Sequence, residues 1–425
     1  MLRDFWEREK MFQVVIPTYN RSKLLKRCLD SIRKQTFSDY EVLILDDCSS
    51  DDTQEVVKEY TKDERFKYVR FEKNHGHGDK VYKEAQELGL FTRDWIVLLG
   101  DDEYFYNALH LQKLQEAIVV NPDANFVGVD CGYGYGEIEV FSENLVALPL
   151  KSFSYQDLTL EQKETLQDKI KVVYKTDFLI ENDIFNAEQQ NKNDSCFEVS
   201  YYTIYQKAVL LYVPEIAHIF GITANARRKY VDFYNWIVSV GMVAFQARDK
   251  DLAYLHLRRC YSDPSMCLNA FFDWGGIELA GVLSYFVLEE DFPKYLRDFA
   301  RIYKDKFQVQ LEDCYHTFNA MLMGEEEKQR EIDAARNVVI YGENQWREQI
   351  EKYFVQQGKK IVFVADDYKE GYKSYQDILR EKDNIDLVFI ASGSPKIIFT
   401  MLRKLKSKEN GIKVATLITR DEGRN

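Results

Sequence analysis

Residues 96–106 read IVLLGDDEYFY, and this stretch places an apolar run directly before three adjacent acids. The run Ile96–Leu99 is typical of a buried strand, and Gly100 ends it before the acids at 101–103. Neighbouring carboxylates repel one another, and burying them is costly unless a positive charge lies among them. A divalent cation would supply that charge, because Mg²⁺ and similar ions prefer carboxylate oxygens as ligands.

Upstream of these acids, short β-rich runs alternate with helical patterns. The expected elements are strands at 12–17, 40–47, 67–74 and 94–102, and helices at 21–35, 49–62 and 80–90. This alternation predicts an α/β fold with a mostly parallel sheet and helices on both faces. Ligands of such sheets bind outside the carboxyl ends of the strands, where Thr18, Asp47 and the acids 101–103 fall.

The composition limits the classes of protein that this sequence can encode. Its 425 residues are 45% hydrophobic, enough for two or three domains. A net charge of −13 gives nucleic-acid binding no electrostatic support from the whole molecule. The seven cysteines lack CxxC or zinc spacing, and the N-terminus lacks a signal-peptide core. We therefore expect a cytoplasmic protein without nucleic-acid partners, with peripheral contact at the inner face of the membrane left open.

Three regions follow from the patterns along the chain. Residues 1–225 contain the first α/β domain, 226–332 form an aromatic-rich helical region, and 333–425 form a smaller parallel α/β unit. A boundary is expected in the acidic run 324–337. The last unit begins like a Rossmann turn at Gly342 but lacks the later glycines of GxGxxG. Docking or homo-oligomerisation is therefore preferred to NAD binding, and a vestigial binding domain is the alternative.

Three motifs carry a resemblance to a known family. VVIPTYNR at 14–21, VLILDDCSSDDT at 42–53 and WIVLLGDDEYF at 95–105 occur in an order and spacing that resemble the family-2 glycosyltransferases of the GT-A fold. The resemblance covers about residues 11–220. It implies inverting transfer of a sugar from a nucleotide sugar, most often a UDP-sugar, to a hydroxyl of a glycan or lipid-linked acceptor. It also implies Mn²⁺ or Mg²⁺ as cofactor and a role in bacterial surface polysaccharide or glycoconjugate synthesis.

The resemblance assigns roles to individual residues of the donor site. The residues implied to bind the nucleotide sugar are Pro17, Thr18, Tyr19, Asn20, Asp47, Lys80 and Asp101. Asp47 matches the carboxylate that reads the uracil ring, and Lys80 stands in for a basic residue of a glycine-rich loop. Asp102 and Glu103 are implied metal ligands, and the Glu departs from the usual Asp-x-Asp pattern. His218 is implied to complete the metal shell or touch the diphosphate.

The general base is expected in a helix that precedes the run YVPE at 212–215. An inverting transferase needs one carboxylate to deprotonate the acceptor hydroxyl. Glu198, which follows Asp102 by 96 residues, is the preferred candidate, and Asp194 is the alternative, better placed as a helix N-cap. The acceptor is expected near residues 130–200, where Tyr133 and Tyr135 would either stack on sugar rings or lie in the core.

Simpler roles and other classes of protein remain as alternatives. Thr18 and Asn20 fit turn positions, the acids at 101–103 fit a solvated turn, and His218 fits the edge of a core. His75 and His77 fit an exposed glycine loop better than a metal site. A non-catalytic carbohydrate-binding or scaffold protein would not need the acids. A sugar nucleotidyltransferase would need a glycine-rich basic loop after the first strand, where PTYNR stands.

Overall fold

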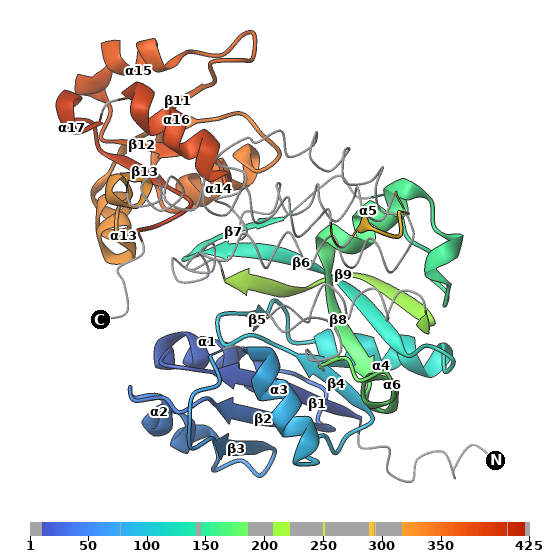
Figure 1. The fold of residues 1–425 in the computed structure, drawn as a ribbon. Coiled ribbons are helices and arrows are strands. Elements are labelled where there is room, and N and C mark those ends of the chain that lie inside the picture. Colours follow the sequence, from blue (N-terminus) through green and yellow to red (C-terminus); the bar gives the residue numbers. More distant parts are fainter. Residues whose placement is uncertain are drawn as a thin grey trace. The chain divides into compact units, whose positions relative to one another are not determined.

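The computed structural model describes residues 11–76, 78–141, 146–185, 207–221, 317–405 and 407–420, with 250, 289–292 and 294 (Figure 1). The chain divides into two compact units, one of residues 1–132 and 145–221 and the other of residues 133–144 and 222–425. Within the described residues, no helix has both the length and the apolar character needed to cross a bilayer. The predicted domain boundaries at 225 and 332 remain predictions, because most of 226–332 lies outside the described residues.

The first unit begins with the parallel sheet that the alternating pattern predicts. Its elements are β1 (Phe12–Thr18), α1 (Ser22–Arg33), β2 (Tyr40–Asp46), α2 (Thr53–Tyr60), β3 (Phe66–Arg70), α3 (Gly78–Glu87) and β4 (Trp95–Leu98). β1 pairs in parallel with β2 and β4, and β2 pairs with β3. The register sets Thr18 opposite Asp46, so the carboxyl ends of β1 and β2 lie at one edge of the sheet.

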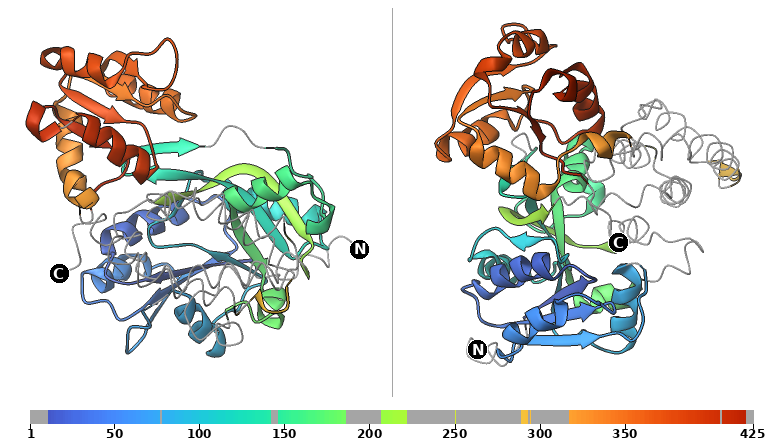
Figure 2. Two further views of the ribbon diagram at one scale, coloured as in Figure 1. Left: turned by 45° about the horizontal axis from the view of Figure 1, so that its top comes forward. Right: turned by 90° about the vertical axis from the view of Figure 1, so that its left-hand side faces the viewer.

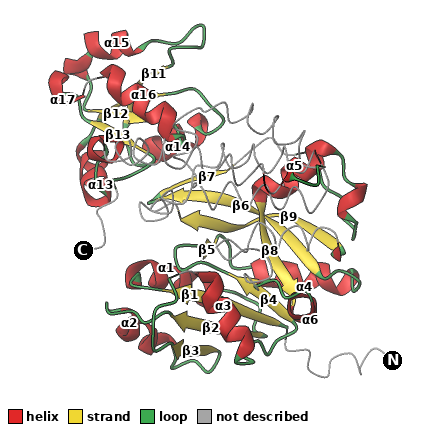
Figure 3. Ribbon diagram, viewed as in Figure 1, coloured by secondary structure: helices red, strands yellow, loops and turns green. Residues whose placement is uncertain are grey.

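Antiparallel strands then extend this sheet, which the strand–helix alternation does not reveal. The elements are β5 (Tyr104–Phe105), α4 (His110–Val120), β6 (Phe126–Tyr135), the 3-10 turn η2 (Tyr155–Asp157), α5 (Leu160–Lys169), β8 (Ile170–Lys175), α6 (Thr176–Glu181) and β9 (Leu210–Gly221). β8 runs antiparallel to both β4 and β6. The strand order is β3-β2-β1-β4-β8-β6-β9-β5, and the predicted α/β class is confirmed with a mixed sheet (Figure 3).

Helix α1 shows how the first unit positions its strand ends. The side chains of Leu25, Cys28, Leu29 and Ile32 recur every three or four residues and are buried in the core. Burying each aliphatic side chain contributes roughly 1.5–3 kcal/mol, so this stripe holds α1 against the sheet. The helix begins immediately after Arg21, which therefore stays at the carboxyl edge of β1. The opposite face of α1 carries Lys23, Lys26 and Arg27.

The second unit contains the smaller parallel sheet predicted near the C-terminus (Figure 2). Its elements are β7 (Ile138–Phe141), α13 (Glu325–Ala334), β10 (Asn337–Tyr341), α14 (Arg347–Gln356), β11 (Lys360–Ala365), α15 (Tyr375–Arg380), the 3-10 turn η6 (Lys382–Asn384), β12 (Leu387–Ile390), α16 (Pro395–Leu405), α17 (Ser407–Asn410) and β13 (Val414–Thr416). The strand order is β11-β10-β12-β13, with every pair parallel. The acidic run expected to be a boundary is helix α13.

Residues 133–144 contribute to the core of this second unit although they precede its sheet by about 200 residues. Tyr135 is 1% exposed and lies 6.2 Å from the ring of Trp346, measured between centroids. Gln349 on α14 exchanges two hydrogen bonds with the backbone of Phe141, at 2.8 and 2.9 Å. Tyr133 packs against the same core. Of the two roles considered for these tyrosines, the structure supports the core role over acceptor stacking.

Candidate active site

The acids after β4 surround a guanidinium group. The Arg21 Nη1 donates to Asp101 Oδ1 at 3.0 Å and to Asp102 Oδ2 at 2.9 Å. The Thr18 hydroxyl donates to Asp101 Oδ2 at 2.8 Å, which ties the end of β1 to the end of β4. The positive charge that the adjacent acids require is therefore supplied here by an arginine of the motif VVIPTYNR.

Burial controls the electrostatics of this cluster. Asp101 is 5% exposed, and its burial raises the pKa of its carboxyl to about 6 despite the opposing attraction of Arg21. Burial acts to lower the pKa of Arg21, but the charges of Asp101 and Asp102 outweigh it and raise that pKa. One guanidinium compensates at most one of the two carboxylates. The cluster therefore carries a net negative charge whenever both Asp101 and Asp102 are ionised.

Glu103 is used differently from the two aspartates. Its Oε2 accepts the backbone N–H of Gly100 at 2.9 Å, which closes the turn after β4. A Cβ at Gly100 would lie 2.9 Å from Asp102 Oδ1, so a larger residue there would displace the Asp102 carboxylate. The Asp102 side chain is 17% exposed, against 6% for Asp101, and is the carboxylate that a ligand reaches first.

The donor set fits the implied divalent cation. Two carboxylates at a strand end supply the hard oxygen ligands that Mg²⁺ and Mn²⁺ prefer. Within the described ranges, no group of three His, Cys, Asp or Glu side chains is arranged to hold a metal ion. A cation at this position would therefore be held by Asp101 and Asp102 together with oxygens of a bound ligand.

The two acids after β2 have separate roles. Asp46 is fully buried, and its carboxylate accepts the N–H of Ser49 at 2.8 Å and the hydroxyl of Tyr68 at 2.5 Å. Asp47 accepts the backbone N–H of His75 at 2.9 Å on Oδ1 and at 3.1 Å on Oδ2. Asp46 therefore fixes the loop that follows β2 through its bond to Ser49. Asp47 instead contacts His75, in the segment before α3.

His75 lies between two carboxylates, although the sequence favoured exposure in a glycine loop. Its Nδ1 is 2.5 Å from Asp47 Oδ1 and its Nε2 is 2.5 Å from Glu84 Oε2. The side chain is 9% exposed and packs edge-on against Phe71. The sequence signal for this contact is weak, because Glu84 becomes a neighbour only once α3 folds. His77 lies outside the described residues.

The other residues of the implied nucleoside loop are placed as follows. Pro17 lies under the start of α3, with its Cγ 3.9 Å from where a Cβ on Gly78 would be. Asn20 adopts a positive φ of 53°, and its Oδ1 accepts the N–H of Ser50 at 2.7 Å. Asn20 therefore has the turn role considered for it. Tyr19 is half-buried beside it, and Lys80 is exposed on α3.

His218, implied to complete the metal shell or touch the diphosphate, lies among buried rings next to β5 and α4. This residue is 0% exposed on β9, and its Nε2 lies 3.0 Å from Nε2 of His110. Its ring also meets Phe105 edge-on, with centroids 5.1 Å apart. A histidine whose ring nitrogen is engaged inside an aromatic cluster serves packing, which is the alternative given above.

The buried His110 predicts an acid-sensitive fold. Burial, with a smaller contribution from the charge of Lys113, lowers the pKa of His110 to about 3, from an ordinary value of 6.5. As pH falls below 6.5, His110 becomes protonated in the unfolded chain but stays neutral in the folded chain. The free energy of unfolding therefore decreases as pH falls toward 3. Between pH 7 and pH 5 the expected loss from this group is about 2 kcal/mol. Urea unfolding at both pH values should show it, and His110→Gln should remove it. An equal pH slope in both proteins would contradict this account.

The two candidates for the general base, Glu198 and Asp194, lie outside the described residues. Their assignment stays a prediction. The described part of the site consists of Thr18, Arg21, Asp47 and the acids 101–103, brought together from the ends of three neighbouring parallel strands.

Comparisons with known proteins match the part of the chain that contains these residues. The model of the family described as "Glycosyl transferase family 2" matches residues 13–186. An uncharacterized glycosyltransferase of Haemophilus influenzae is 29% identical over 167 residues, 39% of this chain and 49% of the relative. The GalNAc(5)-diNAcBac-PP-undecaprenol beta-1,3-glucosyltransferase of Campylobacter jejuni is 26% identical over 258 residues, 56% of this chain and 76% of the relative.

The solved structure of TarS residues 1–349 from S. aureus has a TM-score of 0.48 and 20% identity, over 72% of this chain and 91% of that one. The chain spans about half the length of the Haemophilus relative. The three motifs and the family match fall in the same part of the first unit, around the carboxyl ends of β1, β2 and β4. Residues 13–186, which contain the described part of the site, therefore match the glycosyltransferase family 2 model.

Proposed function

We propose that this protein transfers a sugar from a UDP-sugar to a hydroxyl of a glycan or lipid-linked acceptor, with inversion at the anomeric carbon. The observation that supports it is the convergence of Thr18, Asp47 and the Asp101–Asp102 pair at adjoining strand ends. The Campylobacter relative, named for a PP-undecaprenol acceptor, supports a lipid-linked acceptor. We propose a role in bacterial surface glycan synthesis, in the cytoplasm at the inner face of the membrane.

The donor is held by the strand ends in this proposal. Asp47 accepts from the base, and Thr18 and Asp101 hold the ribose side of the nucleotide. Asp101 and Asp102 would hold Mn²⁺ or Mg²⁺, which, when bound, stabilises the negative charge of the diphosphate leaving group. Arg21 must then release at least one of its two carboxylate contacts, because it occupies the same oxygens.

The transfer itself is a single displacement. Glu198 removes the proton of the acceptor hydroxyl as that oxygen attacks the anomeric carbon. The new carbon–oxygen bond forms on the side of the anomeric carbon opposite the diphosphate. The bond from that carbon to the diphosphate breaks, and UDP leaves with the electron pair. Asp194 is the alternative base. Homo-oligomerisation through the C-terminal unit is proposed as a separate role of that unit.

The first test is calorimetric titration with UDP, with and without Mn²⁺, on the native chain and on Asp102→Asn. We expect micromolar binding, about −8 kcal/mol, that depends on the metal and weakens at least tenfold in the variant. Binding of GDP or dTDP in place of UDP would contradict the role of Asp47 while leaving the fold assignment intact. The absence of nucleotide binding would favour the alternative function, a non-catalytic carbohydrate-binding or scaffold protein.

His75 is expected to position Asp47 for the nucleobase. Replacing the ring by His75→Ala leaves the Asp47 carboxylate with fewer donors to fix its direction. We expect UDP affinity to fall about tenfold, the equivalent of 1.4 kcal/mol. Glu84→Gln is the matched control, because it keeps an acceptor oxygen at Nε2 and should lose less. Unchanged UDP affinity in His75→Ala would show that Asp47 is positioned without it.

A further inference from the structure

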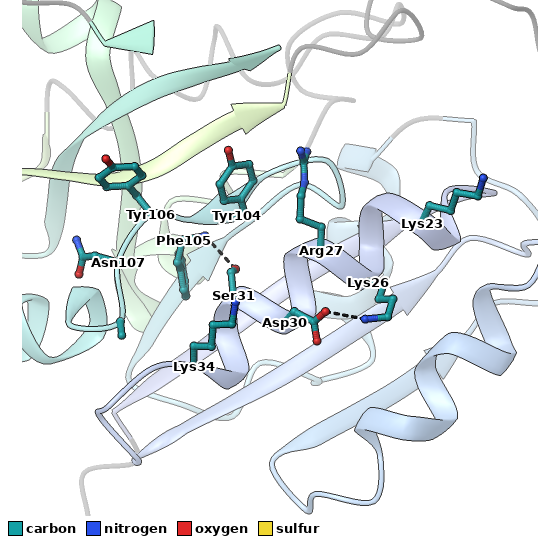
Figure 4. Close-up of a pocket in the computed structure, with 11 residues that line it drawn as sticks. Lys23, Lys26, Arg27, Asp30, Ser31, Lys34, Tyr104, Phe105, Tyr106 and Asn107 are labelled. Atoms are coloured by element: carbon teal, nitrogen blue, oxygen red, sulfur yellow. Dashed lines mark hydrogen bonds and ion pairs between the residues drawn. The ribbon is translucent and has the colours of Figure 1, made fainter. Parts of the chain in front are cut away.

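A cationic groove lies along the face of α1 that is turned away from the core (Figure 4). It has a volume of about 530 Å³ and lies between α1 and residues 104–108. Four of its lining side chains are cationic, Lys23, Lys26, Arg27 and Lys34, and one is acidic, Asp30. On a chain with a net charge of −13, this is a local reversal of sign.

The cationic side chains are spread along the length of α1 and do not cluster at one position. Lys23, Arg27 and Lys34 lie at positions i, i+4 and i+11 of α1 and its C-cap, so they form a row along one helix face. At 1.5 Å per residue the row spans about 16 Å along the helix. The row offers several cationic contacts to a ligand with more than one phosphate group, whereas a single small anion could meet only one or two of them.

The acid in the groove does not neutralise the row. Asp30 accepts from Lys26 at 2.7 Å, from Arg33 at 3.0 Å and from the Tyr60 hydroxyl at 2.7 Å. Its oxygens are therefore already occupied. Lys23 and Lys34 are exposed, and neither has an acidic partner in the described part of the chain.

Arg27 lies between Lys23 and Lys34 in this row and is half-buried. Its Nη2 donates to the backbone carbonyl of Asp102 at 2.9 Å, and its guanidinium carbon lies 4.5 Å from the centroid of the Tyr104 ring. Figure 4 shows the two side chains next to each other. Among the described residues, its buried Nε has no hydrogen-bond partner. A guanidinium fixed against an aromatic face with donors to spare is suited to phosphate oxygens.

We propose that this groove binds the phosphate-bearing part of the acceptor, a portion with at least two phosphate groups. This inference rests on the proposed transferase function. The donor diphosphate is assigned to the carboxylates of Asp101 and Asp102, whereas Arg27 meets only the backbone of that turn. A concave site with a half-buried arginine favours a discrete ligand over the flat surface of a membrane.

The probe is inorganic tripolyphosphate, titrated into the chain without divalent metal, with UDP added afterwards as a competitor. We expect it to bind the native chain and to lose at least tenfold in affinity in the double variant Lys23→Gln/Lys34→Gln. The matched control is Lys58→Gln/Lys62→Gln, which removes two exposed lysines from the end of α2 and should bind within twofold of the native chain. In transfer assays, tripolyphosphate should compete with the acceptor and not with the UDP-sugar.

Several results would overturn this proposal. They are no binding to the native chain, equal affinity in both double variants, and displacement of tripolyphosphate by UDP, which would assign the groove to the donor. Sedimentation with phosphatidylglycerol vesicles through the same lysines, without tripolyphosphate binding, would make it a membrane contact instead. UDP titration of Lys23→Gln/Lys34→Gln with Mn²⁺ separates the two proposals. Unchanged UDP affinity there, together with no tripolyphosphate binding to the native chain, would overturn the groove proposal and leave the transferase proposal intact.

Discussion

Replacing Glu198 by glutamine should leave donor binding intact and slow sugar transfer by about 10³-fold. A positioned general base contributes 10²–10⁴ in rate, and an amide of the same shape cannot take the proton of the acceptor hydroxyl. UDP affinity should stay within twofold, because the base contacts the acceptor and not the nucleotide. The measurement is the turnover of UDP-sugar with acceptor, beside calorimetry with UDP.

Asp194→Asn is the matched control for this prediction. It removes a carboxylate four residues away in the sequence. As a predicted helix N-cap, Asp194 should affect stability, by about 1 kcal/mol, more than the rate of transfer. If Asp194→Asn abolishes transfer and Glu198→Gln does not, the roles are exchanged. If neither variant loses activity, the base lies elsewhere in the chain.

The Arg21→Met variant should lose roughly 3 kcal/mol of stability at neutral pH. Removing one partner of a buried charge pair leaves the other uncompensated, which typically costs about 3–5 kcal/mol. The Arg21 side chain is 20% exposed, which places the expected loss at the lower end of that range. Urea unfolding should show a smaller loss near pH 5 than near pH 8, because Asp101 can then take up a proton.

A second substitution tests the cause. The double variant Arg21→Met/Asp101→Asn should recover part of the stability, because the more buried of the two uncompensated carboxylates is gone. Arg21→Met alone should also bind Mn²⁺ more tightly than the native chain, since the cation replaces the guanidinium between the same oxygens. Additive losses in the double variant, with unchanged Mn²⁺ affinity, would mean that Arg21 is not the counter-charge of these acids.

The sequence predicted the strand ends well because each is a local pattern. An apolar run followed by Thr18, by Asp47 or by the acids 101–103 identifies the edge of a parallel sheet without knowledge of its neighbours. The counter-charge was missed for the opposite reason. Arg21 stands in a motif quoted for the nucleoside, and only pairing across 80 residues brings it to Asp101.

Non-local packing explains the other differences. His218 shares a strand with YVPE but meets His110 from α4, a contact between residues 108 positions apart. The sequence left Tyr135 open between stacking on a sugar ring and lying in the core, because the core that it completes is formed by residues about 200 positions later. Composition and periodicity describe what a segment can bury, and they do not identify the partner against which it is buried.

The hairpin of β6 and β7 has a consequence for synthesis on the ribosome. Phe141 is made 208 residues before Gln349, the α14 side chain that pairs with its backbone. At 5–20 residues per second, the apolar face of this hairpin waits roughly 10–40 s for its partner strands to emerge. During that interval Tyr135, Ile138 and Val140 have no completed core to enter. The nascent chain therefore presents a chaperone with a binding site that the finished protein no longer has.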